Sequence, residues 1–183
     1  MDEQLEFMKL IASRLDSVGI HYMMTGSMAM AIYSVPRMTR DIDLVVEVEP
    51  NDVDNIVDLF SGDCYIDSDS VRQAVDKRST FNIIHNEWVV KADFIIKNNE
   101  EYRREEFARR QEVVIEDMTI FVVSVEDLIL SKLVWGKQSQ SELQLRDVRQ
   151  MISTVSVLDW KYMKKWAIVL GIDVLLEKAR ENE

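Results

Sequence analysis

A short apolar segment with acids at alternating positions constrains this chain most strongly. The segment is DIDLVVEV, which begins with Asp41 and Asp43 on either side of Ile42 and is rich in β-branched residues. Such a run is typical of a β-strand, in which side chains alternate between the two faces. Asp41 and Asp43 then share one face, whereas Ile42, Leu44 and Val46 point to the other. The chain must therefore build a sheet that is apolar on one face and charged on the other.

A second strand-like segment, VVKADFIIK, contributes a third acid. The same alternation places Lys91, Asp93 and Ile95 on one of its faces. An aspartate buried without a partner in so apolar a strand would be costly, so Asp93 needs one. If the strand lies beside DIDLVVEV, Asp93 completes a nest of three carboxylates with Asp41 and Asp43. The alternative is a strand-end aspartate that pairs with an arginine.

Carboxylates this close together favour a bound cation. They repel each other, and each raises the pKa of its neighbour unless a cation lies between them. Magnesium prefers a few carboxylates together with the phosphate oxygens of a substrate, which matches Asp41, Asp43 and Asp93. We therefore predict one or two Mg²⁺ ions at this site. An acid-x-acid strand by itself is also common on ordinary surfaces, so the prediction depends on the features around it.

A glycine-serine turn lies upstream of both strands. Residues 21–24 predict a short strand, and residues 28–33 predict a helix that opens at Ser27. Between them, Gly26 and Ser27 aim backbone N–H groups and the positive end of the helix at one point, where a phosphate would bind. Gly26 lets a phosphate approach the backbone, and Ser27 can cap the helix and bind a phosphate oxygen. Taken alone, Gly-Ser before a helix predicts only a cap.

The order of these features resembles the DNA polymerase β-like nucleotidyltransferase superfamily. Its signature is a hydrophobic residue, Gly, then Gly or Ser, a spacer, and finally Asp, a hydrophobic residue and Asp or Glu. Here Gly26-Ser27 is followed, after the spacer 28–40, by Asp41-Ile42-Asp43. Thr25 stands where the signature prefers an apolar residue, and the spacer is long for the family.

A finer resemblance concerns the run PRMTRDID, residues 36–43. It is similar to the R-x-T-x-D-I-D motif of the bacterial AbiEii-like and related nucleotidyltransferases, which include toxin components of toxin–antitoxin and phage-defence systems. Those proteins also carry a lysine in a helix after the core and an aspartate in the following helix. Lys132 and Asp147 match that arrangement. The resemblance covers residues 23–152.

The resemblance implies an α/β (α+β) fold, with a nucleotidyltransferase-fold mixed β-sheet flanked by helices. Residues 1–123 would form this core. From residue 124 onward the sequence predicts only helices, so residues 124–183 would form a helical C-terminal region packed on the core. Ser124 and Asp127 predict the cap of its first helix. The polar stretch 61–70 predicts a loop.

The resemblance and the side-chain chemistry together suggest roles for the acids. Asp41 and Asp43 would hold Mg²⁺ against the phosphates of a nucleoside triphosphate. Asp93 would help to bind a second ion and would lower the pKa of an acceptor hydroxyl.

Four further residues are candidates for nucleotide binding, beside Gly26 and Ser27. Lys132 would reach a phosphate as a point charge, or it would snorkel at a rim. Arg37 and Arg40 would clamp a phosphate or merely neutralise the acids. Asp147 would orient Lys132 or an acceptor, or it would form an ordinary ion pair with an arginine of its own helix.

The predicted function is Mg²⁺-dependent transfer of a nucleotidyl group from a nucleoside triphosphate to a hydroxyl of RNA such as a tRNA end, of a protein or of a small molecule. A toxin–antitoxin or defence setting would add an antitoxin-like partner. The alternative is a non-catalytic nucleotide-binding or regulatory module on a degenerate nucleotidyltransferase scaffold. A third interpretation, an antitoxin-like or multimeric interaction protein, depends on the helical region alone.

Charge and composition limit the binding partners and the cellular location that we expect for this chain. A formal net charge of −11 opposes broad binding to nucleic acid or to anionic membranes. Residues 100–110 alternate in charge and predict a solvated helix, whose arginines, with Arg72, Lys77 and Arg78, leave room for a local RNA-binding patch. The N-terminal segment lacks the features of a signal peptide, and no apolar stretch is long enough to span a bilayer. Cys64 is the single cysteine, so an internal disulfide is excluded. These features predict a cytoplasmic protein that does not bind membranes.

Overall fold

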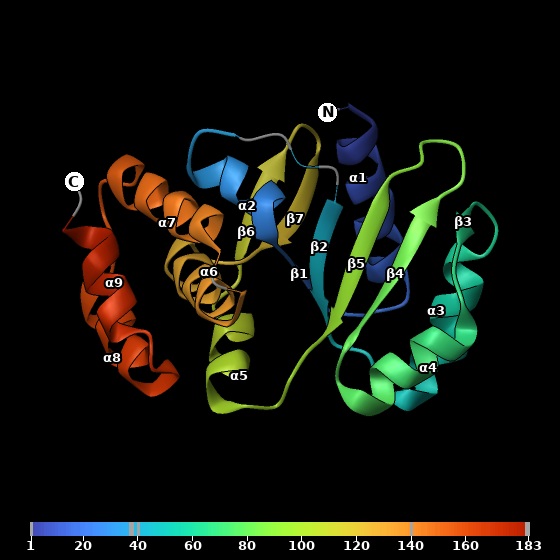
Figure 1. Ribbon diagram of the computed structural model, residues 1–183. Coiled ribbons are helices and arrows are strands. Elements are labelled where there is room, and N and C mark those ends of the chain that lie inside the picture. The colour runs from blue at the N-terminus through green and yellow to red at the C-terminus, as the bar shows by residue number, and fades with distance from the viewer. Residues whose placement is uncertain (1, 37–38, 40, 140, 182–183) are drawn as a thin grey trace.

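The computed structural model describes residues 2–36, 39, 41–139 and 141–181, which fold around one seven-stranded mixed sheet (Figure 1). Across the sheet the strands are β3 (Cys64–Tyr65), β4 (Thr80–His85), β5 (Lys91–Ile96), β2 (Asp41–Val46), β1 (Tyr22–Thr25), β7 (Met118–Val122) and β6 (Gln111–Ile115). Strands β5 and β2 pair in parallel, as do β1 and β7, and the other neighbours are antiparallel. The predicted α/β class with a mixed sheet is confirmed.

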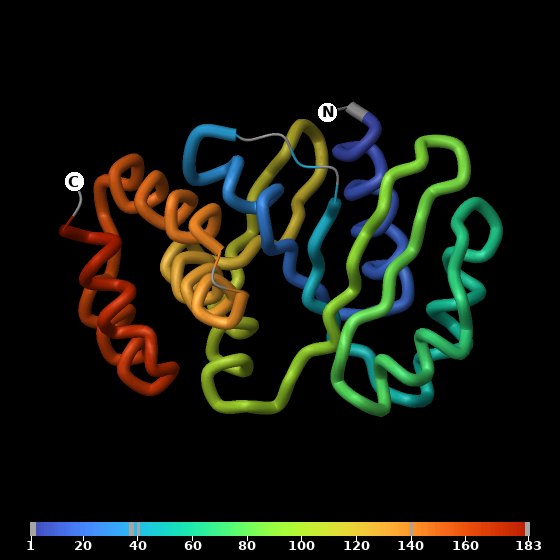
Figure 2. Tube along the Cα trace, viewed as in Figure 1, coloured from blue at the N-terminus to red at the C-terminus, as the bar shows by residue number. Residues whose placement is uncertain are grey.

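Helices pack against this sheet and lie at both of its ends. They are α1 (Asp2–Ser17), α2 (Gly26–Tyr33), α3 (Val53–Phe60), α4 (Ser68–Lys77), α5 (Glu101–Ala108), α6 (Val125–Ser139), α7 (Glu142–Thr154), α8 (Trp160–Leu170) and α9 (Asp173–Arg180), with the 3₁₀ turn η1 (Pro50–Asp52) before α3. Figure 2 shows α3 and α4 at the end of the sheet near β3, and α7 to α9, in orange and red, at the opposite end. Within the described ranges, no helix has the length and apolar character that a membrane crossing needs.

The apolar face predicted for DIDLVVEV forms the centre of the core. Ile42, Leu44 and Val46 of β2 are completely buried, as is Phe94 on the adjacent strand β5. The ring of Phe94 stacks on Phe81 of β4 with their centroids 5.0 Å apart. Burying this face commits the alternate residues of β2 and β5 to the opposite side of the sheet, which is where the acids lie.

Two predicted boundaries are wrong. The stretch 61–70 is not one loop, because it contains the edge strand β3 and the start of α4. Asp67 caps that helix by accepting a hydrogen bond from the Ser70 backbone N–H at 2.8 Å. Helix α2 begins at Gly26 rather than at Ser27, and Thr25 occupies its cap position without a side-chain cap hydrogen bond. The polar stretch predicts a loop because Asp67, which caps α4, is a residue type that loops and helix caps share.

The C-terminal part of the chain follows the prediction in its secondary structure. All described residues in helices or strands after Ser124 are helical, from α6 to α9. The division into a core of residues 1–123 and a helical region of residues 124–183 stays a prediction.

Candidate active site

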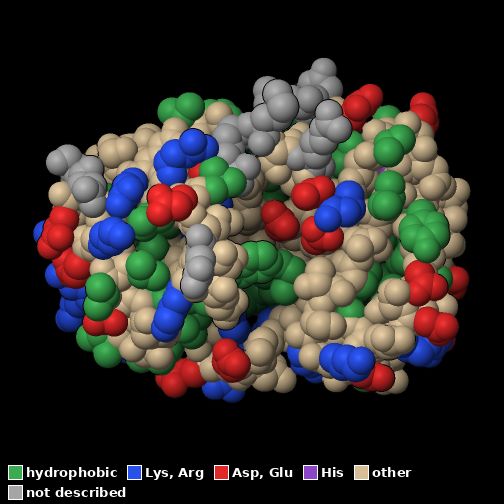
Figure 3. Space-filling view, in the orientation of Figure 1, with side chains coloured by type: hydrophobic (Ala, Val, Ile, Leu, Met, Phe, Trp, Pro, Cys, Tyr) green, Lys and Arg blue, Asp and Glu red, His purple; other side chains and the backbone are tan. Residues whose placement is uncertain are grey.

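The parallel register of β2 and β5 brings the three predicted acids to one face. Asp43 lies opposite Asp93, and Asp41 lies opposite Lys91. We call Asp41, Asp43 and Asp93 the acidic cluster. Figure 3 shows acidic side chains gathered around a basic one over the central strands, next to a hollow lined by apolar side chains. The adjacency that the sequence predicted only conditionally is therefore present.

Lys91 is the direct partner of two of these acids. Its Nζ lies 2.9 Å from Asp93 Oδ2 and 3.7 Å from Asp41 Oδ1. The hydrogen bond to Asp93 raises the pKa of Lys91, and the charges of the three acids raise it further. The partner of Asp93 is thus a lysine two residues away on its own strand, and not the arginine of the alternative interpretation.

The carboxylates of the acidic cluster are the kind of ligand that magnesium binds. Among the described residues, no group of three or more His, Cys, Asp or Glu side chains is already arranged to hold a metal ion. The donors are nevertheless carboxylate oxygens, which Mg²⁺ prefers. A cation, the Lys91 ammonium, already lies between Asp41 and Asp93. The donor chemistry of the acidic cluster therefore fits a divalent ion, and Lys91 now lies between two of its carboxylates.

Gly26 is required because its backbone lies against the carboxylate of Asp43. Its φ is +69°, a left-handed conformation that favours glycine. A Cβ added at Gly26 would lie 1.9 Å from Asp43 Oδ2. This approach joins the start of α2 to the acidic cluster. Ser27 lies buried in the first turn of α2 and is not its cap residue, because Thr25 occupies that position without a side-chain cap hydrogen bond. Ser27 lines the same cleft as Asp43.

The electrostatics of Asp43 reflect this crowding. Burial raises the pKa of its carboxyl above the ordinary value, and the charges of Asp93 and Asp41 raise it further. The charges of Lys132 and Lys91 lower it. The site therefore holds excess negative charge, which a bound cation would relieve.

Lys132 and Asp147 form a buried ion pair between α6 and α7. Lys132 is only 5% exposed and Asp147 1%, and Lys132 Nζ lies 2.8 Å from Asp147 Oδ2. Gln144 Oε1 also accepts from Lys132 at 3.2 Å. Lys132 therefore does not snorkel at a rim, and Asp147 orients it. Arg37 and Arg40 lie outside the described residues.

A cleft with a volume of about 280 Å³ connects Asp43 to the helices. Most of its lining comes from the α2 turn, the central strands, α5, α6 and α7. The lining residues are Thr25, Gly26, Ser27, Asp43, Val45, Arg78, Ile95, Ile96, Lys97, Asn98, Arg103, Glu106, Leu128, Ser131, Lys132, Trp135 and Gln144. Asp43 is the member of the acidic cluster that lines it. Asp41 and Asp93 lie beside the cleft rather than in its wall.

Sequence reasoning missed one polar group in this cleft. Arg103 Nη1 donates to Glu106 Oε2 and to Ser131 Oγ, each at 2.8 Å, and Ser131 donates to Glu106 Oε1 at 2.5 Å. Burial raises the pKa of Glu106, against the opposing effect of Arg103. Residues 100–110 alternate in charge and predict a solvated helix. The only hint of a buried side was the apolar pair Tyr102 and Phe107.

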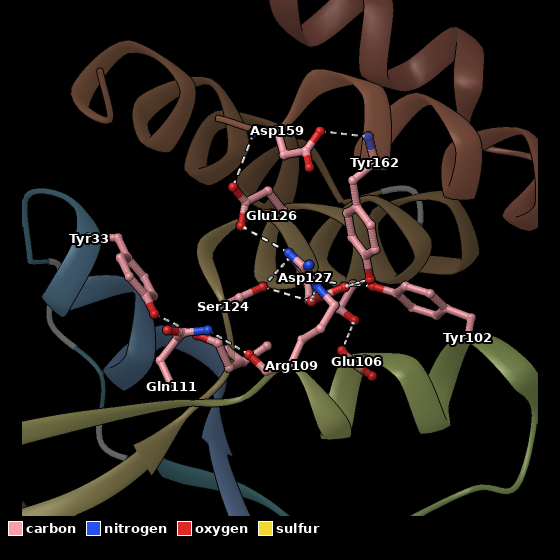
Figure 4. A network of polar contacts seen from close by, with 12 residues as sticks. Tyr33, Tyr102, Glu106, Arg109, Gln111, Ser124, Glu126, Asp127, Asp159 and Tyr162 are labelled. Carbon is pink, nitrogen blue, oxygen red and sulfur yellow. Dashed lines mark hydrogen bonds and ion pairs between the residues drawn. The ribbon is translucent and has the colours of Figure 1, made fainter. Parts of the chain in front are cut away.

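The buried carboxylate of Asp127 joins the start of α6 to the end of α5 and to α8 (Figure 4). Three side chains donate to it: Ser124 Oγ at 2.7 Å, Arg109 Nε at 3.0 Å and the Tyr162 hydroxyl at 2.6 Å. The Asp127 backbone N–H donates to Ser124 Oγ at 3.3 Å, as the predicted cap requires. This network fixes the start of α6, and hence the helix that carries Lys132.

Similarity to known proteins is found in the structure of this chain and not in its sequence. No protein-family model matches the sequence, and no curated protein sequence matches it. A nucleotidyltransferase-like protein from Paracoccidioides brasiliensis matches with a TM-score of 0.60 at 17% identity, over 97% of this chain and 92% of that one. The antibiotic-resistance factor ANT(2'')-Ia matches with a TM-score of 0.59 at 15% identity, over 99% and 93%.

A third solved structure, the lincosamide antibiotic adenylyltransferase LnuA bound to lincomycin, matches with a TM-score of 0.56 at 13% identity, over 85% of this chain and 98% of that one. This chain has a nucleotidyltransferase-like fold. At these identities the likeness establishes the fold alone, and the AbiEii-like resemblance stays a prediction.

Substituting Gly26 tests the contact with Asp43, and Gly19 offers a matched control. Gly19 has a φ of +70°, but a Cβ there would meet nothing within 4 Å. We expect Gly19→Ala to cost about 1–2 kcal/mol of unfolding free energy for the left-handed conformation alone. Gly26→Ala should cost a further ~1–3 kcal/mol, because the new methyl group overlaps Asp43. Urea denaturation measures both, and equal costs would contradict the proposed contact.

The raised pKa of Asp43 makes a prediction about pH. A carboxyl with a raised pKa in the folded state binds its proton more tightly there than in the unfolded chain, so stability falls as pH rises from the ordinary aspartate value through the raised one. Asp43→Asn has no charge to bury. We therefore expect Asp43→Asn to be more stable than wild type at neutral pH, with the difference shrinking on acidification. Urea denaturation across this pH range checks it, and a constant difference would contradict it.

Proposed function

We propose that this protein transfers a nucleotidyl group from a magnesium-bound nucleoside triphosphate to a hydroxyl group. The observation that carries the proposal is the placement of Asp43 opposite Asp93 on parallel strands, with the backbone of Gly26 packed against Asp43. In this arrangement, carboxylates suited to a metal ion lie next to the start of α2, where the helix end favours a phosphate. The nucleotidyltransferase-like fold supports the same reaction class.

Each residue of the site has a role in this proposal. Asp41, Asp43 and Asp93 would bind one or two divalent ions, and Asp93 would also lower the pKa of the acceptor hydroxyl. When bound, Mg²⁺ would offset the negative charge that develops on the phosphates during transfer.

On the other wall of the cleft, Lys132 would stabilise phosphate charge. Asp147 and Gln144 hold its ammonium in place, so little side-chain entropy is lost when a phosphate arrives. Ser27 and the backbone around Gly26 would contact the phosphates from the α2 side. Arg37 and Arg40 remain candidates for the same task on the grounds of sequence.

For the acceptor, we favour the hydroxyl of a small molecule. ANT(2'')-Ia is also known in complex with adenylyl-2''-tobramycin, and that structure matches this chain with a TM-score of 0.54 over 99% of its length. LnuA was solved with lincomycin bound. This chain aligns with 99% of the chain in the ANT(2'')-Ia complex and with 98% of LnuA. A net charge of −11 weighs against RNA. A protein acceptor and a toxin–antitoxin role with an antitoxin-like partner are further hypotheses, from the motif at residues 36–43.

A second candidate function is a nucleotide-binding module without catalysis. One observation favours it: Asp93 already pairs with Lys91, as a purely structural aspartate would.

Transfer from a nucleoside triphosphate labelled at the α-phosphate distinguishes the two candidates. With Mg²⁺ and a panel of hydroxylated small molecules, tRNA and proteins as acceptors, wild type should form labelled product. Asp43→Asn should fall to background, because it removes a metal-binding carboxylate. Asp54→Asn is the matched control, since Asp54 is an exposed acid on α3 that pairs with Arg72, and it should retain activity.

Calorimetry with Mg²⁺ and nucleoside triphosphates completes the test. Tight binding without transfer to any acceptor favours the non-catalytic module. The absence of nucleotide binding by wild type contradicts both candidates.

A further inference from the structure

We propose that Lys91 is a tethered counter-cation for the acidic cluster, which a divalent ion must displace and which then turns to the phosphates of the bound nucleotide. Metal binding would thereby depend on nucleotide. This inference rests on the proposed function, because it takes the acidic cluster to be the metal site.

The register of the sheet holds Lys91 at this position. Lys91 lies directly opposite Asp41 on a parallel strand and two residues from Asp93 on the same face. Neighbouring strands are about 4.8 Å apart, so the lysine stem begins inside the cluster and its ammonium stays within reach of all three acids. It is 37% exposed, which leaves the ammonium room to swing toward solvent or toward a ligand.

The balance of charge explains what Lys91 does in the absence of metal. Asp41 and Asp43 on β2 and Asp93 on β5 place three negative charges on adjacent residues of one face. Lys91 offsets part of this repulsion through contacts of 2.9 Å and 3.7 Å. The Lys132 ammonium is committed to Asp147 and Gln144. Lys91 is thus the lysine that keeps Asp41 and Asp93 together before a metal ion arrives.

The same contacts oppose the binding of free metal. A divalent ion between Asp41 and Asp93 has to break the Lys91–Asp93 pair and then meets a like charge nearby. A metal ion that arrives with a nucleoside triphosphate brings phosphate oxygens, which give the displaced ammonium a new partner. The site would therefore bind free Mg²⁺ weakly and the Mg²⁺–nucleotide complex well.

A purely structural lysine would behave differently. If Lys91 serves only to pair strands β2 and β5, a neutral replacement changes the stability of the fold and leaves metal affinity unchanged. A charge-retaining replacement separates the two roles, because Lys91→Arg keeps the cation whereas Lys91→Met removes it and keeps the unbranched stem.

The experiment measures Mn²⁺ binding by calorimetry, without nucleotide and with a non-hydrolysable nucleoside triphosphate analogue. Without nucleotide, Lys91→Met should bind Mn²⁺ tighter than wild type by on the order of tenfold or more, because a unit charge beside the ion is gone. Lys91→Arg should bind as weakly as wild type. Lys9→Met is the control, since Lys9 pairs with Glu116 away from the cluster, and it should match wild type. Nucleotide should strengthen Mn²⁺ binding more in wild type than in Lys91→Met.

Equal Mn²⁺ affinity in wild type and Lys91→Met overturns the inference about Lys91. The proposed function survives that result if wild type binds the Mg²⁺–nucleotide complex and Asp43→Asn does not. If no variant binds metal or nucleotide, both fail.

A measurement on wild type keeps the inference falsifiable if Lys91→Met does not fold. In the absence of nucleotide, acetylation of lysines, read by mass spectrometry, should rise several-fold at Lys91 when Mn²⁺ is saturating and stay constant at Lys9. Unchanged labelling of Lys91 would contradict displacement.

Discussion

The close approach of the Gly26 backbone to the Asp43 carboxylate determines where the rest of the site can lie. It places the start of α2 against β2, so the helix end that favours a phosphate adjoins the carboxylate that would bind a metal ion. The approach needs a residue without a side chain and with a left-handed backbone, and Gly26 meets both requirements. The apolar face of β2 holds Asp43 from behind, because Ile42 and Leu44 are fixed in the core.

Around this contact, the structure offsets negative charge with cations from separate elements. Lys91 comes from the strand that carries Asp93, and Lys132 comes from α6, whose start is fixed by the buried Asp127 network. Each lysine lowers the pKa of Asp43, against the effects of burial and of the neighbouring acids. The two lysines differ in how far their side chains can move, because Lys132 is buried with Asp147 whereas Lys91 is partly exposed. That difference makes Lys91 the cation that can leave when another arrives.

The sequence predicted the features that depend on local pattern. Alternation in β2 and β5 fixed which side chains share a face, and the order Gly26-Ser27 then Asp41-Ile42-Asp43 pointed to the fold. It could not show that Asp41 lies opposite Lys91, because register depends on pairing between strands far apart in the chain. For the same reason it missed Arg103 and Glu106, whose buried contacts with Ser131 form only when α5 packs on α6.

The central claim is that Gly26, Asp43 and Asp93 form one metal–nucleotide site. Amide signals of the isotopically labelled protein report this directly when Mn²⁺ is added with a non-hydrolysable nucleoside triphosphate, because the ion broadens only nearby signals. We expect strong broadening at Gly26, Asp43 and Asp93, and much weaker broadening in α8, which lies at the end of the molecule away from β5 (Figure 1). Broadening confined to other parts of the molecule, or none with nucleotide present, would contradict it.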